Sequence, residues 1–311
     1  MLAQKIQYIQ LKCSNLFFRN IFKVLYKLSH TGQAKHNRRF WPYYQVERDA
    51  NQGLQKIYFK HQLVVDNTQP ITPKNTQCMM LATGPSVGQI PQNAFQQADM
   101  DYIGLNGAIA MSDVRFAYYV IIDHNFIDSR FDLVKKVLER DCIFYTTPRC
   151  LDQILRKVLF TGIRCQFRVI EPITRNEIEP MLGARQTIDF NQDYIFSAQG
   201  IGFSKQVHTA VFDYFTVAYV ALQIINALRY ETVYLAGLDM NNFAQPRFYE
   251  DRENKQPTLL DRSLDATLPA FALAATFFQQ QGVQVYNLSE QSAVESFTKI
   301  DPNHIWSEQN I

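Results

Sequence analysis

Cys78-Met79-Met80-Leu81-Ala82-Thr83-Gly84-Pro85-Ser86 is an apolar run that ends in a tight turn. Five apolar residues without polar alternation predict a strand that is covered on both faces. Similar runs return along the chain and alternate with stretches of helical periodicity, which predicts an α/β fold with a doubly wound, mostly parallel, Rossmann-like sheet. The predicted strands are 78–82, 102–105, 116–122, 142–145, 233–236 and 283–287, and the predicted helices are 131–140, 151–159, 216–228 and 264–280.

The chain has 311 residues, of which 47% are hydrophobic and 19% charged, enough for one large or two modest globular domains. Its net charge of +2 gives no reason to expect a nucleic-acid partner. The five cysteines form no C-x-x-C pair, which favours reduced thiols in the cytoplasm. No apolar run approaches the roughly 20 residues that a transmembrane helix needs.

Charge is concentrated at the start, where residues 1–46 contain eight Lys or Arg and no acidic residue. Residues 4–29 have the pattern of an amphipathic helix, with apolar side chains on one face and Lys5, Lys12 and Arg19 on another. This pattern suits an anionic membrane surface, and a helix docked on its own domain with a solvated basic face is the alternative. We therefore expect a basic membrane-surface segment at 1–50 and a Rossmann-like domain at 51–311. Within it, the turn-rich segment 160–215 is expected to be an inserted lid or acceptor-side segment.

Turns and polar residues follow the predicted strands at their carboxyl ends, where parallel sheets bind ligands. Gly84-Pro85-Ser86 can present N–H groups and a hydroxyl to a phosphate or ribose, or form a plain turn. Asn106-Gly107 offers an amide to a pyrimidine or ribose, or forms an Asn-Gly turn. Asp123 follows the third strand and either holds a ribose hydroxyl or caps the next helix.

The strand at 233–236 runs into Gly237-Leu238-Asp239 and an irregular segment that contains Asn241, Arg247 and Tyr249. Arg247 and Tyr249 are suited to neutralising a leaving phosphate, and a surface salt bridge is the alternative for Arg247. Asp99 and Asp101 precede a strand, which places them at the opposite, amino edge of the sheet, so no metal site is predicted there.

Taken together, these segments resemble the WaaZ-type lipopolysaccharide core Kdo transferases over about 79–295, most densely over 200–290. The segments that carry the resemblance are 84–86, 106–108, Asp123, 216–219, 222–224, 228–230, 233–239, 247–249, Asp265 with 268–269, and 285–289. The resemblance implies an inverting, metal-independent glycosyltransferase with a GT-A-like variant of the Rossmann fold, with CMP-Kdo as donor and no cofactor. It also implies a lipid A–core oligosaccharide acceptor and a peripheral location on the cytoplasmic face of the inner membrane. Thr216, Asp239 and Asn241 are expected among the donor-binding residues.

The layout is more distantly similar to the bacterial CMP-sialic-acid transferases, which have G-x-G-P-S after the first strand. Thr83 stands where that family has Asn, and Asn241 and Arg247 lie near the positions of its phosphate-binding tyrosines. Transfer to a hydroxyl needs a general base. Asp261 aligns with the catalytic His of that family; Asp265 and His208 are the other candidates.

Three other functions are compatible with the sequence. The first is transfer of sialic acid or another CMP-linked nonulosonate. The second is a pterin pyrophosphokinase-like reaction, because such enzymes also have a Gly-Pro-Ser turn, but they require ATP and a divalent ion. The third is a non-catalytic scaffold at the membrane surface, which would not bind CMP. The number of subunits is not indicated by the sequence.

Overall fold

The computed structural model describes residues 15–241, 243–253, 255–256 and 260–306 of the chain. Its centre is a parallel sheet of eight strands in the order β17-β16-β15-β4-β5-β6-β7-β8. The strands are β4 (Gln77–Leu81), β5 (Met100–Leu105), β6 (Phe116–Ile121), β7 (Ile143–Thr146), β8 (Gln166–Val169), β15 (Thr232–Ala236), β16 (Gln284–Asn287) and β17 (Thr298–Lys299).

The order of the strands reverses between β4 and β15. From β4 the chain builds the sheet outward to β8, then returns and adds β15, β16 and β17 on the other side of β4. The carboxyl edge between β4 and β15 is therefore the topological switch point, where open α/β sheets bind their ligands. The predicted fold class is confirmed, and all six predicted central strands belong to this sheet.

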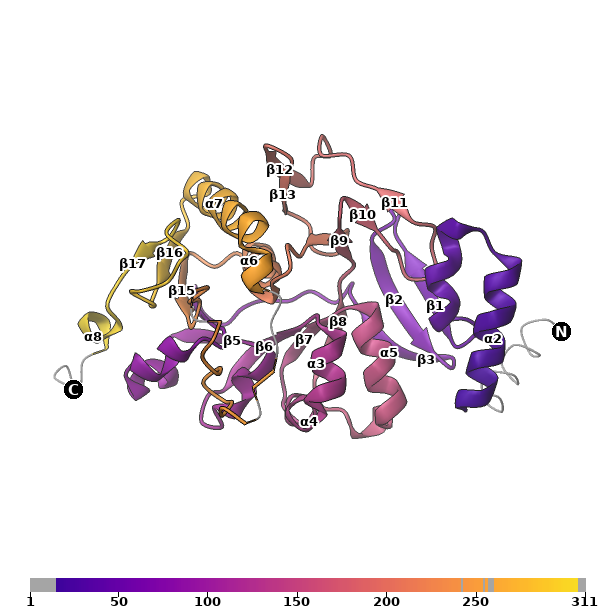
Figure 1. Ribbon diagram of the computed structural model, residues 1–311, viewed down its shortest axis with the longest axis horizontal. Helices are drawn as coiled ribbons and strands as arrows, with labels where there is room; N and C mark the ends of the chain where they lie inside the picture. The colour runs from indigo at the N-terminus through magenta and orange to yellow at the C-terminus, as the bar shows by residue number, and fades with distance from the viewer. Residues whose placement is uncertain (1–14, 242, 254, 257–259, 307–311) are drawn as a thin grey trace.

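Helices cover both faces of the sheet (Figure 1). On one side lie α3 (His124–Ser129), α4 (Phe131–Leu138) and α5 (Pro148–Lys157), and on the other α6 (Val217–Leu228) and α7 (Leu264–Gln280). Alternate residues of β4 enter two separate cores: Met79 and Leu81 pack on the first side, Cys78 and Met80 on the second. Both faces of β4 are thus apolar because both are buried. The short helices are η1 (Gly32–Arg39), η2 (Pro85–Gln89), η3 (Gln92–Gln96), η4 (Asn106–Ala110), η5 (Phe160–Gly162), η6 (Leu260–Arg262) and α8 (Pro302–Ile305).

An N-terminal unit packs at the β8 end of the sheet (Figure 1). It consists of α2 (Leu16–Ser29), η1 and an antiparallel sheet of β1 (Tyr44–Arg48), β2 (Leu54–Phe59) and β3 (Gln62–Asp66). The predicted boundary at residue 50 falls inside this sheet, between β1 and β2. None of the described helices is long and apolar enough to cross a lipid bilayer.

Helix α2 corrects one expectation about the predicted helix 4–29, of which 4–14 lie outside the described residues. Arg19 was expected on a basic face turned to water or lipid, but its side chain is buried and forms a 2.9 Å ion pair with Asp152 of α5. A buried guanidinium needs such a partner to offset its lost hydration. The face that is exposed is the apolar one: Phe17 is 68% and Leu28 81% accessible.

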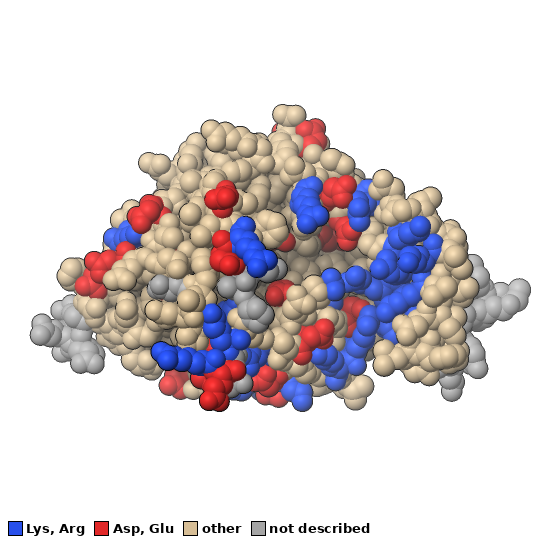
Figure 2. Space-filling view, viewed as in Figure 1, with Lys and Arg blue, Asp and Glu red and all other residues tan. Residues whose placement is uncertain are grey.

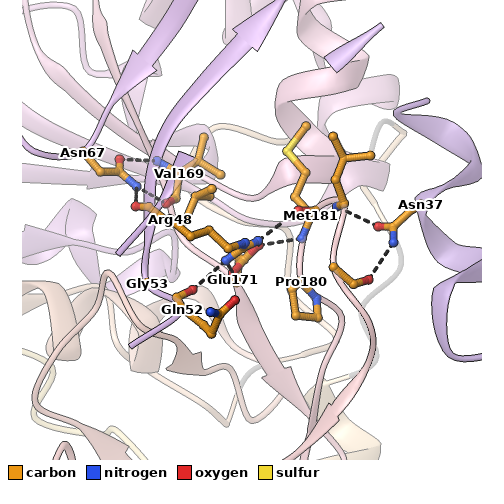
Figure 3. Close-up of polar contacts among 12 residues, drawn as sticks. Asn37, Arg48, Gln52, Gly53, Asn67, Val169, Glu171, Pro180 and Met181 are labelled. Atoms are coloured by element: carbon orange, nitrogen blue, oxygen red, sulfur yellow. Dashed lines mark hydrogen bonds and ion pairs between the residues drawn. The ribbon is translucent and has the colours of Figure 1, made fainter. Parts of the chain in front are cut away.

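The turn-rich segment 160–215 contains the edge strand β8 and then leaves the main sheet. Its remaining strands are short: β9 (Pro172–Thr174), β10 (Glu177–Ile178), β11 (Gln186–Thr187), β12 (Ile195–Ala198), β13 (Ile201–Ser204) and β14 (Val211–Phe212). A polar network ties this segment to the N-terminal unit (Figure 3). Glu171 accepts hydrogen bonds from both terminal nitrogens of Arg48 and from the backbone N–H of Met181. A role of this segment as a lid stays a prediction.

Candidate functional site

The turn after β4 and the turn after β15 lock together at the switch point. The backbone N–H and the hydroxyl of Ser86 both donate hydrogen bonds to the carboxylate of Asp239. A side chain at Gly84 would overlap that carboxylate, so glycine is required by the close approach of the two turns. Ser86 and Asp239 were both predicted to touch the donor. The structure brings them together: they hydrogen-bond to each other, and these hydrogen bonds fix the shape of the turn.

The turn after β5 presents an amide whose oxygen has no partner. Asn106 has a φ of +45°, a left-handed conformation that Asn tolerates better than most residues. The hydroxyl of Tyr119 fixes the turn by donating to the Asn106 carbonyl and accepting from the Ile109 N–H, both at 2.7 Å. The side-chain oxygen Oδ1 of Asn106 is buried and accepts no hydrogen bond from the described residues. Because an unpaired buried oxygen is costly, its position favours a ligand donor at this place.

The segment after β15 crosses the carboxyl edge of the sheet and covers the turn at Asn106. It is anchored at one end where the Phe248 N–H donates to the carbonyl of Thr83 after β4 (3.3 Å). At the other end the Gln256 amide donates to the Ser129 hydroxyl in α3 (2.6 Å). Between these anchors the Tyr249 ring lies directly against Gly107, where any side chain would overlap it.

The hydroxyl of Tyr249 is also buried and has no hydrogen-bond partner of regular geometry among the described residues, and the guanidinium of Arg247 lies beside it. Burial raises the pKa of Tyr249 to about 12, and the nearby guanidinium of Arg247 opposes this rise. The phenol therefore stays protonated at neutral pH and can donate a hydrogen bond. Asn106 and Tyr249 thus supply an acceptor and a donor from two segments that meet at Gly107, and a sugar or nucleotide needs both.

Arg247 is held in place by a carboxylate that the sequence analysis did not single out. Its guanidinium forms a 2.8 Å ion pair with Glu250, whose side chain is fully buried. Arg130 at the end of α3 approaches the same carboxylate, at 3.8 Å. The alternative predicted for Arg247, a surface salt bridge, is confirmed in part: the ion pair exists and the Arg247 guanidinium is partly exposed, but the Glu250 carboxylate is buried. The spacing of three between Arg247 and Glu250 was the sequence signal for this pair.

Three further predicted donor-binding residues have local structural roles. Asp123 caps α3 by accepting from the Asn125 N–H at 2.8 Å, and Thr216 caps α6 by accepting from the Ala218 N–H. Asn241 donates to the backbone carbonyl of Gln291. Of the two readings of Asp123, the helix cap is confirmed; its carboxylate is exposed at the carboxyl edge and has one oxygen that receives no described hydrogen bond.

The predicted base candidates lie in two different places. Asp261 in η6 and Asp265 in the first turn of α7 are exposed, and α7 begins on the carboxyl side of the sheet because it leads from β15 to β16. His208 lies elsewhere: its carbonyl accepts from the Leu54 N–H of β2, beside the β8 end of the sheet. The distance from β4 to β8 is four strand spacings, about 19 Å, so His208 is far from the switch point.

Asp213 is an additional carboxylate that the sequence did not reveal. It follows β14 and directly precedes Tyr214 and Phe215, which both have positive φ values (36° and 63°). Burial raises its pKa above the ordinary value, although hydrogen bonds from the Phe215 N–H and the Thr174 side chain oppose the rise. Strained backbone and a perturbed carboxyl together are typical of functional sites. A two-residue strand has no periodicity, so no sequence pattern marks Asp213.

Asp101 lies at the amino edge of the sheet, as predicted, but it is the second residue of β5 instead of preceding the strand, and it is buried. It accepts hydrogen bonds from the Tyr230 hydroxyl (2.7 Å) and from the Asn75 side chain (3.0 Å), so it joins the segments that lead into β15 and β4. Among the described residues, no group of three or more His, Cys, Asp or Glu is arranged as a metal site.

The model of the family "3-deoxy-D-manno-octulosonic acid transferase WaaZ" matches residues 193–302. A probable 3-deoxy-manno-octulosonic acid transferase of Escherichia coli (strain K12) is 31% identical over 94 residues, which are 30% of this chain and 32% of that protein. The protein of the same description from Salmonella typhimurium (strain LT2) is 24% identical over 250 residues, which are 70% of this chain and 83% of that protein.

Among solved structures, the monofunctional α-2,3-sialyltransferase Cst-I from Campylobacter jejuni aligns with a TM-score of 0.41 and 11% identity, over 75% of this chain and 83% of that one. The family match and the two relatives confirm the resemblance to WaaZ-type Kdo transferases. The matched residues, 193–302, include β15, the segment that carries Arg247 and Tyr249, and α7.

Proposed function

We propose that this protein is a glycosyltransferase that transfers Kdo from CMP-Kdo to a lipid-linked core oligosaccharide. The observation that carries the proposal is the pair of buried polar atoms without a regular hydrogen bond, Asn106 Oδ1 and Tyr249 Oη, which belong to two segments in contact at Gly107 on the carboxyl edge of the sheet. The similarity to WaaZ-type transferases supports Kdo as the sugar.

Arg247 and Tyr249 act on the departing nucleotide. As the bond between the sugar and CMP breaks, negative charge grows on the phosphate. A guanidinium and a phenol O–H fixed beside it stabilise that charge. Glu250 holds Arg247 in place, and because the carboxylate is shared with Arg130, the site keeps a net positive charge.

The acceptor hydroxyl must lose a proton as it attacks the sugar. We propose Asp213 as the base alongside the predicted Asp261 and Asp265, because a carboxyl with a raised pKa accepts a proton more readily near neutral pH. Attack opposite to the departing CMP inverts the anomeric centre. Because the leaving group is a nucleoside monophosphate, we propose that Arg247 and Tyr249 suffice to support it without a divalent ion.

We further propose that the protein acts at the cytoplasmic face of the inner membrane, with the exposed apolar face of α2 in contact with lipid. That face comprises Leu16, Phe17, Ile21, Val24, Leu25 and Leu28. Such a set on one helix side is costly in water and suits the boundary of an anionic bilayer.

Thermal unfolding in the presence of CMP tests the nucleotide assignment, because a ligand of the folded state raises the melting temperature. We expect a concentration-dependent rise for the wild type and little or no rise for Asn106→Ala. Ser112→Ala, at an exposed hydroxyl beyond the same short helix, is the matched control and should respond like the wild type. A wild-type melting temperature that CMP does not change would refute the assignment.

A further inference from the structure

Figure 2 shows a band of Lys and Arg side chains that runs across the face of the molecule, over the N-terminal unit and toward α5. Two arginines of these elements, Arg39 at the end of η1 and Arg149 in the first turn of α5, take part in none of the ion pairs among the described residues. Arg19 joins the two elements, because it donates a 2.9 Å hydrogen bond to the Arg39 carbonyl and forms a 2.9 Å ion pair with Asp152 of α5. Arg39 and Arg149 each lower the pKa of His124, at the start of α3, and Arg149 lowers that of Arg39. The fold thus brings like charges together.

The arrangement is not explained by internal neutralisation. Arg39 is half-buried, and burial and Arg149 both lower its pKa. Asp152 and Glu179 are the acids that oppose this lowering. The carboxylate of Asp152 is already bonded to Arg19, Arg156 and the Tyr44 hydroxyl, and Glu179 is paired with Arg185. Lys23 of α2 is exposed to the same positive charges: burial, and then the guanidinium groups of Arg156, Arg19 and Arg39, lower its pKa. A half-buried guanidinium group at Arg39 and an exposed one at Arg149, neither in an ion pair with a described carboxylate, suit an anion from outside.

The location relates this cluster to the proposed reaction. Arg149 and His124 follow β7 and β6 at the same carboxyl edge of the sheet as Asn106, which follows β5. One to two strand spacings, about 5–10 Å, separate the ends of these strands, so the cluster adjoins the donor site without overlapping it. On its other side lies α2, whose outward face is apolar. The cluster therefore lies between the proposed membrane contact and the proposed donor.

We propose that Arg39 and Arg149, with His124 beside them, bind an anionic group of the acceptor glycan, a phosphate or a carboxylate. This inference rests on the proposed function for the identity of the acceptor. Two guanidinium groups bind such an anion through several charge-assisted hydrogen bonds. The N-terminal end of α5 adds a partial positive charge that also favours the anion. Burial and Arg149 lower the pKa of His124, so the imidazole is neutral at neutral pH and donates one further N–H.

The direct test is binding of the phosphate-bearing core oligosaccharide, freed of its lipid, to the full chain in the presence of CMP, measured by calorimetry. We expect Arg39→Ala and Arg149→Ala each to weaken this binding by about ten- to a hundredfold, the effect of losing charge-assisted hydrogen bonds. The affinity of Arg149→Lys should lie between those of the wild type and Arg149→Ala, because lysine keeps the positive charge but lacks the paired N–H donors of the guanidinium group. Lys136→Ala, on the exposed side of α4, removes one charge elsewhere and should change nothing.

Further measurements on the same variants separate the alternatives. Affinity for CMP and for vesicles of anionic phospholipid should stay unchanged in Arg39→Ala and Arg149→Ala. If vesicle binding falls and oligosaccharide binding does not, the cluster contacts lipid headgroups and the inference is wrong. Oligosaccharide binding that is absent in the wild type, or equal in all variants, also overturns it. Arginine-dependent oligosaccharide binding without any transfer from CMP-Kdo would instead contradict the proposed donor and leave the subsite standing.

Discussion

The Tyr249 ring lies against Gly107 so closely that even a methyl group at position 107 would overlap it. This contact joins two segments more than a hundred residues apart and places the phenol hydroxyl beside the turn of Asn106. Together they define the edge at which we place the donor.

Replacement of Gly107 tests this contact. Gly107→Ala should displace the Tyr249 ring and weaken CMP binding by about tenfold, within the usual range for inserting a methyl group into a packed site. Gly88→Ala is the matched control, because no atom lies within 4 Å of a Cβ at that nearby position. Equal CMP affinity in both variants, measured by calorimetry, would show that the ring is not part of the site.

Arg247 should contribute to turnover more than to stability. Arg247→Ala is expected to lower kcat by about ten- to a thousandfold, on the scale of losing a donor to a developing oxyanion. Arg247→Lys should recover part of the loss. Glu250→Gln removes the carboxylate that holds the guanidinium, and it should lower kcat while leaving the slope of its pH profile unchanged. Near-normal turnover of Arg247→Ala would discard the assignment.

The raised pKa of Tyr249, about 12, makes a prediction about pH. The phenol keeps its proton throughout the range from pH 6 to pH 10, so the ratio of kcat in wild type and Tyr249→Phe should be constant over that range. The loss itself should be about tenfold, as expected for one hydrogen bond to a charged group. A ratio that approaches one as the pH rises toward 10 would show that the hydroxyl titrates within the range, contrary to the structure.

Asp213 should make stability depend on pH. Its folded-state pKa is raised above the ordinary value of 3.8 because burial disfavours the charged form. The folded protein then holds this proton more tightly than the unfolded chain, so stability falls as the pH rises from 3.8 through the folded-state pKa. Asp213→Asn should therefore raise the melting temperature at pH 7, and this gain should disappear below pH 3.8. If Asp213 is the base, the same substitution should also abolish transfer.

The exposed Asp261→Asn is the control for that experiment and should leave the melting temperature unchanged at either pH. If instead Asp261→Asn abolishes transfer and Asp213→Asn does not, Asp261 is the base and Asp213 is a structural carboxyl.

The apolar face of α2 can be tested without disturbing the fold. Phe17→Ser with Leu28→Ser should weaken binding to anionic vesicles by about tenfold or more, since each side chain would bury apolar area in the bilayer. The melting temperature should change little because both side chains are exposed. Leu159→Ser, at an equally exposed position on another part of the surface, should bind vesicles like the wild type.

The sequence predicted the sheet well because central parallel strands are apolar on both faces and their turns carry Gly, Pro and Asn. The predicted strand at 78–82 is shifted by one residue from β4, and the predicted helix at 264–280 has the same bounds as α7. The roles of single polar residues were less predictable. Ser86 and Asp239 bond to each other across 153 positions, and Arg19 pairs with Asp152, contacts that no local spacing signals. Helix periodicity predicted that Arg19 and the apolar side chains lie on different faces, but it did not say which face would be buried.

Acceptor-stimulated release of CMP tests the central claim most directly. Purified protein in EDTA would be given CMP-Kdo, generated in situ, or CMP-sialic acid in parallel, each with and without a Kdo–lipid A acceptor. We predict that CMP is released from CMP-Kdo when the acceptor is present, that EDTA does not prevent it, and that CMP-sialic acid is not consumed. Release from CMP-sialic acid alone, or no release from either donor together with no binding of CMP, would contradict the account.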